Sequence, residues 1–277
     1  NIYKKLESII DNYISGNNFD NNNIYLDKDG LISSGTEDTQ NTWMDAKYNN
    51  IAVTPRNGKT VEINAMWYNA NMIMANLTMK MGDLLKIKKY KELAKKCKTS
   101  FEEKFYNPKT KCLYDVLGDE KIRPNQLFAL SLTYPVINSN SEIAKNMINI
   151  VEKKLLNNYG LKTLAKGEEK YIEIYEGDPY HRDTSYHQGI TWPWLLGLYY
   201  NSLKNIEKEE KDKEVKEQTS QKIEKFQNKV YKTFKKELEE NGCIGSISEL
   251  YDSVKPQLPK GAIAQAWSVA EIFRIIF

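Results

Sequence analysis

Apolar residues recur every three or four positions along most of the chain, a period that predicts amphipathic helices. Gly16 and Gly82 directly follow two of these stretches and are typical residues at the C-terminal end of a helix. Strand-like alternation is rare and short, so the pattern predicts an all-α fold built from helix hairpins. We expect helices over residues 2–15, 62–81, 84–105, 124–133, 140–157, 187–203, 222–240 and 261–276.

Two of the intervening loops, 32–61 and 157–186, are long for a simple helix bundle. Loops of this length in a compact domain usually carry function. A different pattern covers residues 204–240, which are rich in Lys and Glu and have few apolar positions. This segment predicts a solvated helix surface with a flexible break near Gln218–Ser220.

The overall composition describes a nearly neutral chain. Its 277 residues include 40 Lys+Arg and 37 Asp+Glu, a net charge of +3, so we expect one domain over 1–277 and no nucleic-acid partner. No apolar run approaches the roughly 20 residues that cross a bilayer, so we expect no membrane contact. The cysteines Cys97, Cys112 and Cys243 are odd in number and far apart. This argues against disulfides and a Cys-rich zinc site, and predicts free thiols in the cytoplasm with no metal or cofactor.

The rare residue types are informative against this background of Lys, Asn and Ile. The chain has only four Arg, two His and five Trp. All the Trp and His residues lie in four polar stretches, at 42–47, 54–69, 175–194 and 247–267. Each stretch combines flat aromatic rings with side chains that make directed hydrogen bonds. A sugar ring has an apolar C–H face and a belt of hydroxyl groups, so this mixture predicts a glycan site.

Other chemistries fit the chain poorly, because it has no phosphate-binding loop, no metal-ligand spacing around its His residues and no nucleophile elbow. Two carboxyl groups suffice for glycoside hydrolysis, one protonated and one ionised. An apolar wall of Trp43 and Met44 could keep the neighbouring Asp45 protonated. The pattern leaves open which pair acts among Asp45, Glu62, Glu176, Asp178 and Glu249.

Six stretches carry a family resemblance: Thr42–Lys47, Pro55–Asn69, Pro124–Leu130, Tyr175–Trp194, Ser246–Asp252 and Gly261–Glu271. Together, and in this order, they resemble the C-terminal glucosidase domain of prokaryotic-type glycogen debranching enzymes, an amylo-α-1,6-glucosidase. The resemblance implies an (α/α)6 toroid of the six-hairpin glycosidase type, in which helix pairs surround a central pocket. We count about eight or nine helices where this toroid has twelve. We therefore expect a ring that is incomplete at the N-terminus, and a separate N-terminal domain or segment as a partner.

The resemblance also implies roles for individual residues. Asp45 would be the general acid and Glu249 the general base of an inverting enzyme, with their carboxyl groups about 6.5–9.5 Å apart. The substrate would be glycogen or another branched α-glucan. Residues expected to bind it are Trp43, Arg56, Glu62, Asn64, Trp67, Asn125, Gln126, Glu176, Asp178, His187, Gln188, Trp192 and Gln265.

Three alternatives remain open at this stage. The chain could be a related toroid glucosidase of the glucoamylase or trehalase type, because the linkage is recognised beyond the cleaved bond. It could be a truncated, non-catalytic remnant that binds glycans. A helical-repeat scaffold is the third alternative, and it predicts that Asp45 and Glu249 can be replaced without effect.

Overall fold

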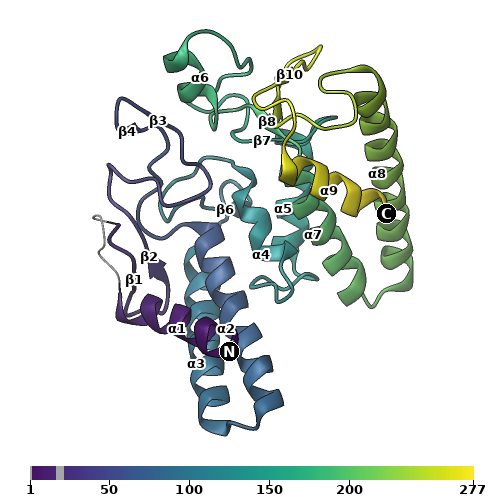
Figure 1. Ribbon diagram of the computed structural model, residues 1–277. Helices are drawn as coiled ribbons and strands as arrows, with labels where there is room; N and C mark the ends of the chain where they lie inside the picture. The colour runs from purple at the N-terminus through teal and green to yellow at the C-terminus, as the bar shows by residue number, and fades with distance from the viewer. Residues whose placement is uncertain (1, 17–21) are drawn as a thin grey trace.

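The computed structural model describes residues 2–16 and 22–277, and this part of the chain is mostly helical (Figure 1). Its helices are α1 (Ile2–Ser15), α2 (Val61–Met81), α3 (Leu84–Lys104), the 3₁₀ turn η2 (Pro124–Leu127), α4 (Phe128–Ser131), α5 (Glu142–Lys154), α6 (Pro179–Ser185), α7 (Leu195–Glu209), α8 (Lys213–Glu240) and α9 (Ala266–Ile276). Its strands have two residues each: β1 (Tyr25–Leu26), β2 (Ile32–Ser33), β3 (Lys47–Tyr48), β4 (Ile51–Ala52), β5 (Tyr106–Asn107), β6 (Cys112–Leu113), β7 (Leu161–Lys162), β8 (Thr191–Trp192), β9 (Leu250–Tyr251) and β10 (Pro259–Lys260).

The helix hairpin of α2 and α3 confirms the two strongest periodic patterns. Gly82 ends α2 in the left-handed conformation, with φ 75°, which glycine adopts without strain. Asp83 then caps α3 by accepting a hydrogen bond from the backbone N–H of Lys86 at 3.1 Å. On the inner side of α3, the rings of Phe101 and Phe105 stack at 4.4 Å within the core. Figure 1 shows this hairpin extending away from the loops that carry the aromatic motifs.

The second half of the chain packs α7, α8 and α9 against one another, with α4 on the other side of α7. Buried residues on α8 are Ile223, Phe226, Val230, Phe234 and Glu237, the spacing of one helix face. The predicted break near Gln218–Ser220 is wrong, because α8 is continuous from Lys213. The Asp212 side chain caps it by accepting from the N–H groups of Glu214 and Val215.

Two other predicted helices begin later than expected. Helix α7 begins at Leu195 instead of residue 187, because Gly189 has φ 133° and Thr191 pairs in a sheet. A Cβ at Gly189 would lie 2.3 Å from the carbonyl oxygen of Ile172, so only glycine fits at this close approach of the two segments. Helix α9 begins at Ala266 instead of residue 261, because residues 261–265 form a turn that wraps the carboxylate of Glu249.

The expectation of a strictly all-α fold is too simple. Four short strands form an antiparallel sheet in the order β10-β9-β8-β7. In its centre Thr191 pairs with Tyr251, and at its edge Leu161 pairs with Trp192. This sheet holds two segments, 187–194 and 246–252, side by side although they are far apart in the chain. Both segments carry predicted site residues.

Several general properties accompany this architecture. All three cysteines are free thiols. No helix in the described residues combines the length and apolar character needed to cross a membrane. Within residues 2–16 and 22–277, no group of three or more His, Cys, Asp or Glu side chains is arranged to hold a metal ion.

Candidate active site

Four tryptophans and a histidine from separate segments form one aromatic cluster. The ring centroid of Trp43 lies 5.1 Å from that of His187, 5.6 Å from Trp192 and 4.9 Å from Trp194. Trp267, in the first turn of α9, stacks on Trp194 at 5.2 Å and remains 38% exposed. Rings that are buried on one side and open at Trp267 give the cluster an accessible apolar surface, which suits a sugar face.

Asp45 lies at the edge of the aromatic cluster, in the loop before β3. Its Oδ1 is 3.7 Å from Nε2 of His187, and its side chain is 65% exposed. His187 itself is fully buried, and neither of its ring nitrogens has a hydrogen-bond partner in the described residues. Burial lowers the pKa of His187, and the proximity of Asp45 offsets this only in part. Asp45 therefore faces a neutral imidazole at neutral pH.

The environment of Asp45 differs from the one expected from sequence. We expected an apolar wall of Trp43 and Met44 to keep this carboxyl protonated. Instead His187 lowers the pKa of Asp45 below its ordinary value, against a smaller opposing effect of burial. Met44 is fully buried, and its sulfur lies 3.8 Å from a guanidinium nitrogen of Arg123, below the loop. In the free protein, Asp45 is accordingly ionised at neutral pH.

Glu249 lies just before β9 and is held by three donors. Tyr186 donates its hydroxyl to Oε1 at 2.5 Å, and the Gln265 amide donates to the same oxygen at 3.3 Å. The backbone N–H of Ala262 donates to Oε2 at 3.0 Å. Gly261 allows this turn, because it has φ 70° and a Cβ there would lie 2.4 Å from Oε2 of Glu249. The half-buried carboxylate is thereby fixed in one orientation.

Tyr186 connects the two carboxylates. Its ring centroid is 4.8 Å from that of His187, which contacts Asp45, and its hydroxyl bonds Glu249. Burial and the negative charge of Glu249 raise the pKa of Tyr186, and Asp45 adds to this increase. Tyr186 thus remains a neutral donor and lies within electrostatic reach of both carboxylates.

A buried ionic network supports Trp43 from below. Both the Arg56 guanidinium and its acceptors are at least nine-tenths buried. Arg56 donates Nε to Asp115 Oδ2 at 2.6 Å and Nη2 to Glu62 Oε2 at 2.7 Å. Asp115 also accepts from the amide of Asn125 at 2.8 Å, and Asn125 in turn accepts from the indole N–H of Trp43 at 2.7 Å. Burial alone would lower the pKa of Arg56, but Asp115 and Glu62 raise it above its ordinary value.

Arg123 forms a second buried support, directly behind His187. Its Nη1 donates to the carbonyl oxygens of His187 at 2.7 Å and Thr163 at 3.0 Å, and its Nη2 donates to Gln188 Oε1 at 2.8 Å. These bonds fix the backbone that positions the imidazole beside Asp45. Burial lowers the pKa of Arg123, and the nearby Asp115 counteracts this.

Three predicted site residues lie in the interior. Asn64 bonds both backbone polar groups of Ile32, accepting at 2.7 Å and donating at 3.0 Å. Trp67 packs against Tyr13 of α1 with ring centroids 5.9 Å apart. Gln126 donates to the carbonyl oxygen of Arg123 at 3.0 Å. These contacts connect secondary-structure elements, and the structure does not bring these side chains to the aromatic cluster.

Glu176 and Asp178 are exposed in the loop before α6. Asp178 caps α6 by accepting from the N–H of His181 at 3.0 Å. The same loop packs Tyr175 against Tyr186 at 5.7 Å, and Tyr180 against Tyr48 at 5.1 Å. In Figure 1, α6 and its loop lie at the same end of the molecule as β3, β8 and β10. The loop therefore spans from the Asp45 side of the site to the Glu249 side.

Sequence reasoning did not select three residues that shape the site. Tyr186 stands beside the chosen His187, so its place in that motif is a signal that could have identified it. Trp194 could have been identified in the same way, because it follows the selected Trp192 by two positions in the same motif. Asp115 had none, because it lies in a turn segment outside the four stretches that contain the Trp and His residues.

Comparison with known proteins adds a family and a fold. The model of the family described as "Amylo-alpha-1,6-glucosidase" matches residues 1–274. Among solved structures, the chain is similar to a sialidase, with 14% identity and a TM-score of 0.62 over 97% of this chain and 22% of that one. It is also similar to the GH63 mannosylglycerate hydrolase from Thermus thermophilus in complex with glucose, with 12% identity and a TM-score of 0.51. That match covers 79% of this chain and 44% of the hydrolase. The chain thus spans less than half the length of either structure, and the likeness concerns the fold alone.

Proposed function

The chain belongs to the amylo-alpha-1,6-glucosidase family, and from this premise we propose that it is a glycoside hydrolase domain that releases glucose from the α-1,6 branch points of glycogen. One observation carries the proposal. Asp45 and Glu249, about 200 positions apart in sequence, both reach the same aromatic cluster through His187 and Tyr186. Glycoside hydrolysis uses a pair of carboxyl groups, and an aromatic surface beside them suits the apolar face of a sugar ring.

Asp45 is the general acid in this proposal. It is ionised in the free protein, so it has to gain a proton before or during substrate binding. A bound sugar would cover its exposed side chain and remove water from it. Desolvation disfavours the charged form of a carboxyl group, so the bound substrate raises the pKa of Asp45 and favours its protonation. The proton then passes to the oxygen of the glycosidic bond as the bond breaks.

Glu249 is the general base, and it activates a water molecule on the opposite face of the sugar. Its three hydrogen-bond donors fix the orientation of the carboxylate. Attack from the face opposite the leaving group inverts the anomeric centre. We therefore expect the two carboxyl groups to be separated by about 6.5–9.5 Å in the complex, with room for the water.

The aromatic cluster supplies the apolar surface for the glucose ring, with Trp267 at its open edge. Gln265, which bonds Glu249 at 3.3 Å, is an amide that could also bond a hydroxyl group of the sugar. We assign Arg56, Glu62 and Asn125 to the support of Trp43, because each is buried and bonded within the network. We further propose that the helix pairs form part of an (α/α)6 toroid around this pocket. The packing of α7 between α4 and the pair α8 and α9 supports this arrangement.

The direct test measures glucose release from a glucosyl-branched dextrin, from maltose and from trehalose. We expect a preference for the branched dextrin and a first product with the inverted anomeric configuration, detected by NMR. Glu249→Gln should lower kcat by orders of magnitude but keep ligand affinity within about tenfold, because the isostere keeps the contacts and loses the base. Glu103→Gln, an exposed change on α3, serves as the control.

Three outcomes would contradict the proposal in different ways. A preference for maltose or trehalose would indicate a different glucosidase. Binding of limit dextrin without turnover would indicate a glycan-binding domain without catalysis. Near-normal turnover of Glu249→Gln would show that another residue is the base.

A further inference from the structure

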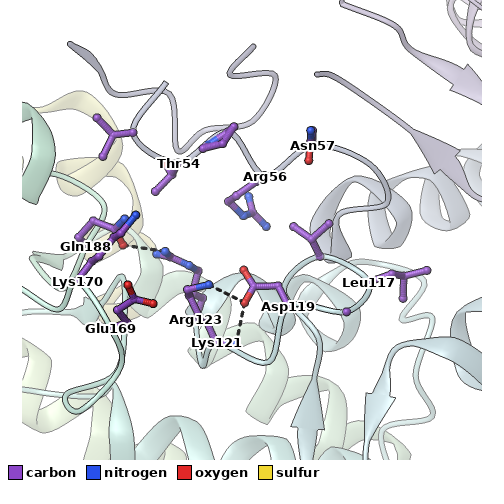
Figure 2. A pocket seen from close by; sticks show the side chains of 14 residues that line it. Thr54, Arg56, Asn57, Leu117, Asp119, Lys121, Arg123, Glu169, Lys170 and Gln188 are labelled. Atoms are coloured by element: carbon purple, nitrogen blue, oxygen red, sulfur yellow. Dashed lines mark hydrogen bonds and ion pairs between the residues drawn. The ribbon is translucent and has the colours of Figure 1, made fainter. Parts of the chain in front are cut away.

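A second concave site lies beside the aromatic cluster. A cleft of about 510 Å³ is lined by the segments 53–57, 116–121 and 169–170 and by Arg123 and Gln188. Figure 2 shows the side chains that line it. This volume is within the range of about 300–1,000 Å³ that is typical of small-molecule sites. Neither Asp45 nor Glu249 lines the cleft, and no ring of the aromatic cluster does. The cleft is therefore separate from the carboxylate pair.

The charges around the cleft cancel. Lys121 pairs with Asp119 at 3.0 Å, and Glu169 stands next to Lys170 in the chain. Arg56 and Arg123 at the base are balanced by Glu62 and Asp115 directly behind them. An anion or cation would meet no net opposite charge here, so the lining favours an uncharged ligand.

The polar side chains of the lining can nevertheless make many hydrogen bonds. The side chains of Asn57, Glu169 and Lys170 have no protein partner in the described residues, and Gln188 uses only its oxygen, toward Arg123. These groups offer donors and acceptors on both sides of the cleft (Figure 2). The lining also includes apolar surface from Val53, Pro55, Val116 and Leu117. Free donors, free acceptors and apolar carbon together match a chain of sugar rings.

We propose that this cleft binds a second segment of α-glucan chain, apart from the residue that is cleaved. The choice of glucan over other polyhydroxylated ligands rests on the proposed function. The cleft is also linked to the catalytic side. Arg123 bonds both Gln188 in the cleft and the carbonyl oxygen of His187, the residue beside Asp45. A chain held in the cleft thus contacts the same support that positions the acid.

The test uses protection of lysines from acetylation, measured by mass spectrometry on the full chain. The probe is maltoheptaose, which has no α-1,6 linkage. At ten times its Kd it should slow acetylation of Lys170 about tenfold, since protection follows 1 + [L]/Kd. Lys88, 75% exposed on α3, is the internal control and should not change. Lack of protection at Lys170 would overturn the proposal.

Variants and a second probe complete the test. Leu117→Trp fills the cleft and should abolish the protection, whereas Leu84→Trp adds the same ring at a site that is 78% exposed and should not. Asn57→Ala, a smaller change, should weaken binding about three- to tenfold by removing one amide.

Protection by inorganic phosphate in place of maltoheptaose would show an anion site and overturn the proposal. The assay is repeated with Glu249→Gln, in which protection should persist. Loss of turnover and loss of glucan binding in the cleft are therefore measured separately.

Discussion

Arg56 is the residue whose loss should most damage the folded state of the candidate site. It is fully enclosed and bonds two carboxylates, Asp115 at 2.6 Å and Glu62 at 2.7 Å. The side chains of all three are at most 4% exposed. Arg56→Met keeps much of the side-chain volume but leaves the buried Glu62 without its cation, and leaves Asp115 with Arg123 alone, at 3.6 Å.

The expected cost follows from this burial. Removing one partner of a buried ion pair typically destabilises a protein by about 3–5 kcal/mol, because the remaining charge has lost its solvent and its partner. Arg56→Met orphans Glu62 and removes the shorter of the two ion pairs of Asp115, so its cost should lie within that range. Typical domains have only about 5–15 kcal/mol of stability, so a large fraction would be lost.

Urea unfolding followed by tryptophan fluorescence measures the effect as a shift of the midpoint at constant slope. Lys88→Met is the matched control, because the ion pair of Lys88 with Glu92 is solvent-exposed and contributes about 0–1 kcal/mol. Adding Glu62→Gln to Arg56→Met removes the orphaned charge of Glu62 and should restore part of the stability. A loss below about 1 kcal/mol for Arg56→Met, equal to that of the control, would refute the role of the network.

Three further predictions concern the catalytic side chains and the thiols. Tyr186→Phe removes a hydrogen bond to Glu249 that is worth about 1.5–3 kcal/mol, so kcat should fall about ten- to hundredfold with little change in KM. An unchanged kcat would show that Tyr186 does not orient the proposed base. His187→Phe keeps the ring stacked on Trp192 but removes the contact that lowers the pKa of Asp45. The acid then stays protonated to higher pH, so the alkaline limb of the kcat/KM profile should move to higher pH, and a shift in the opposite direction would contradict this assignment. Burial raises the pKa of Cys97 to about 12 and also raises that of Cys112, so only the partly exposed Cys243 should react with a thiol reagent before unfolding. Two or more fast-reacting thiols would contradict the described packing.

Most helices could be predicted from the sequence because helical periodicity is a local property. The hairpin of α2 and α3 needed only its apolar spacing and the Gly82-Asp83 turn. The errors occurred where tertiary contacts outweigh local preference. Residues 187–194 and 261–265 look helical by pattern, but pairing in the sheet and binding of Glu249 require extended or turn backbone.

The candidate site could be predicted as a set of residue types and less well as a set of contacts. Its rare aromatic and charged residues indicated segments that meet in the structure, where four of the five tryptophans form one cluster. Within those segments, sequence could not separate inward from outward positions. Arg56 and Glu62 lie in a polar motif, yet they bond each other in the interior, while Asp45 in the preceding polar stretch is exposed.

The sequence by itself determined the helical stretches, the chemical inventory of the site and the resemblance to one glucosidase family. Only the tertiary structure decided that Tyr186 joins the two carboxylates, that His187 makes Asp45 more acidic, and that a neutral cleft lies beside them. The physical reason is the sequence separation over which each property is determined. Backbone periodicity depends on neighbours a few positions away, whereas pKa shifts and buried ion pairs depend on side chains brought together from distant positions. Asp45 reaches His187 and Glu249 reaches Tyr186, two neighbouring rings, through packing that no local pattern encodes.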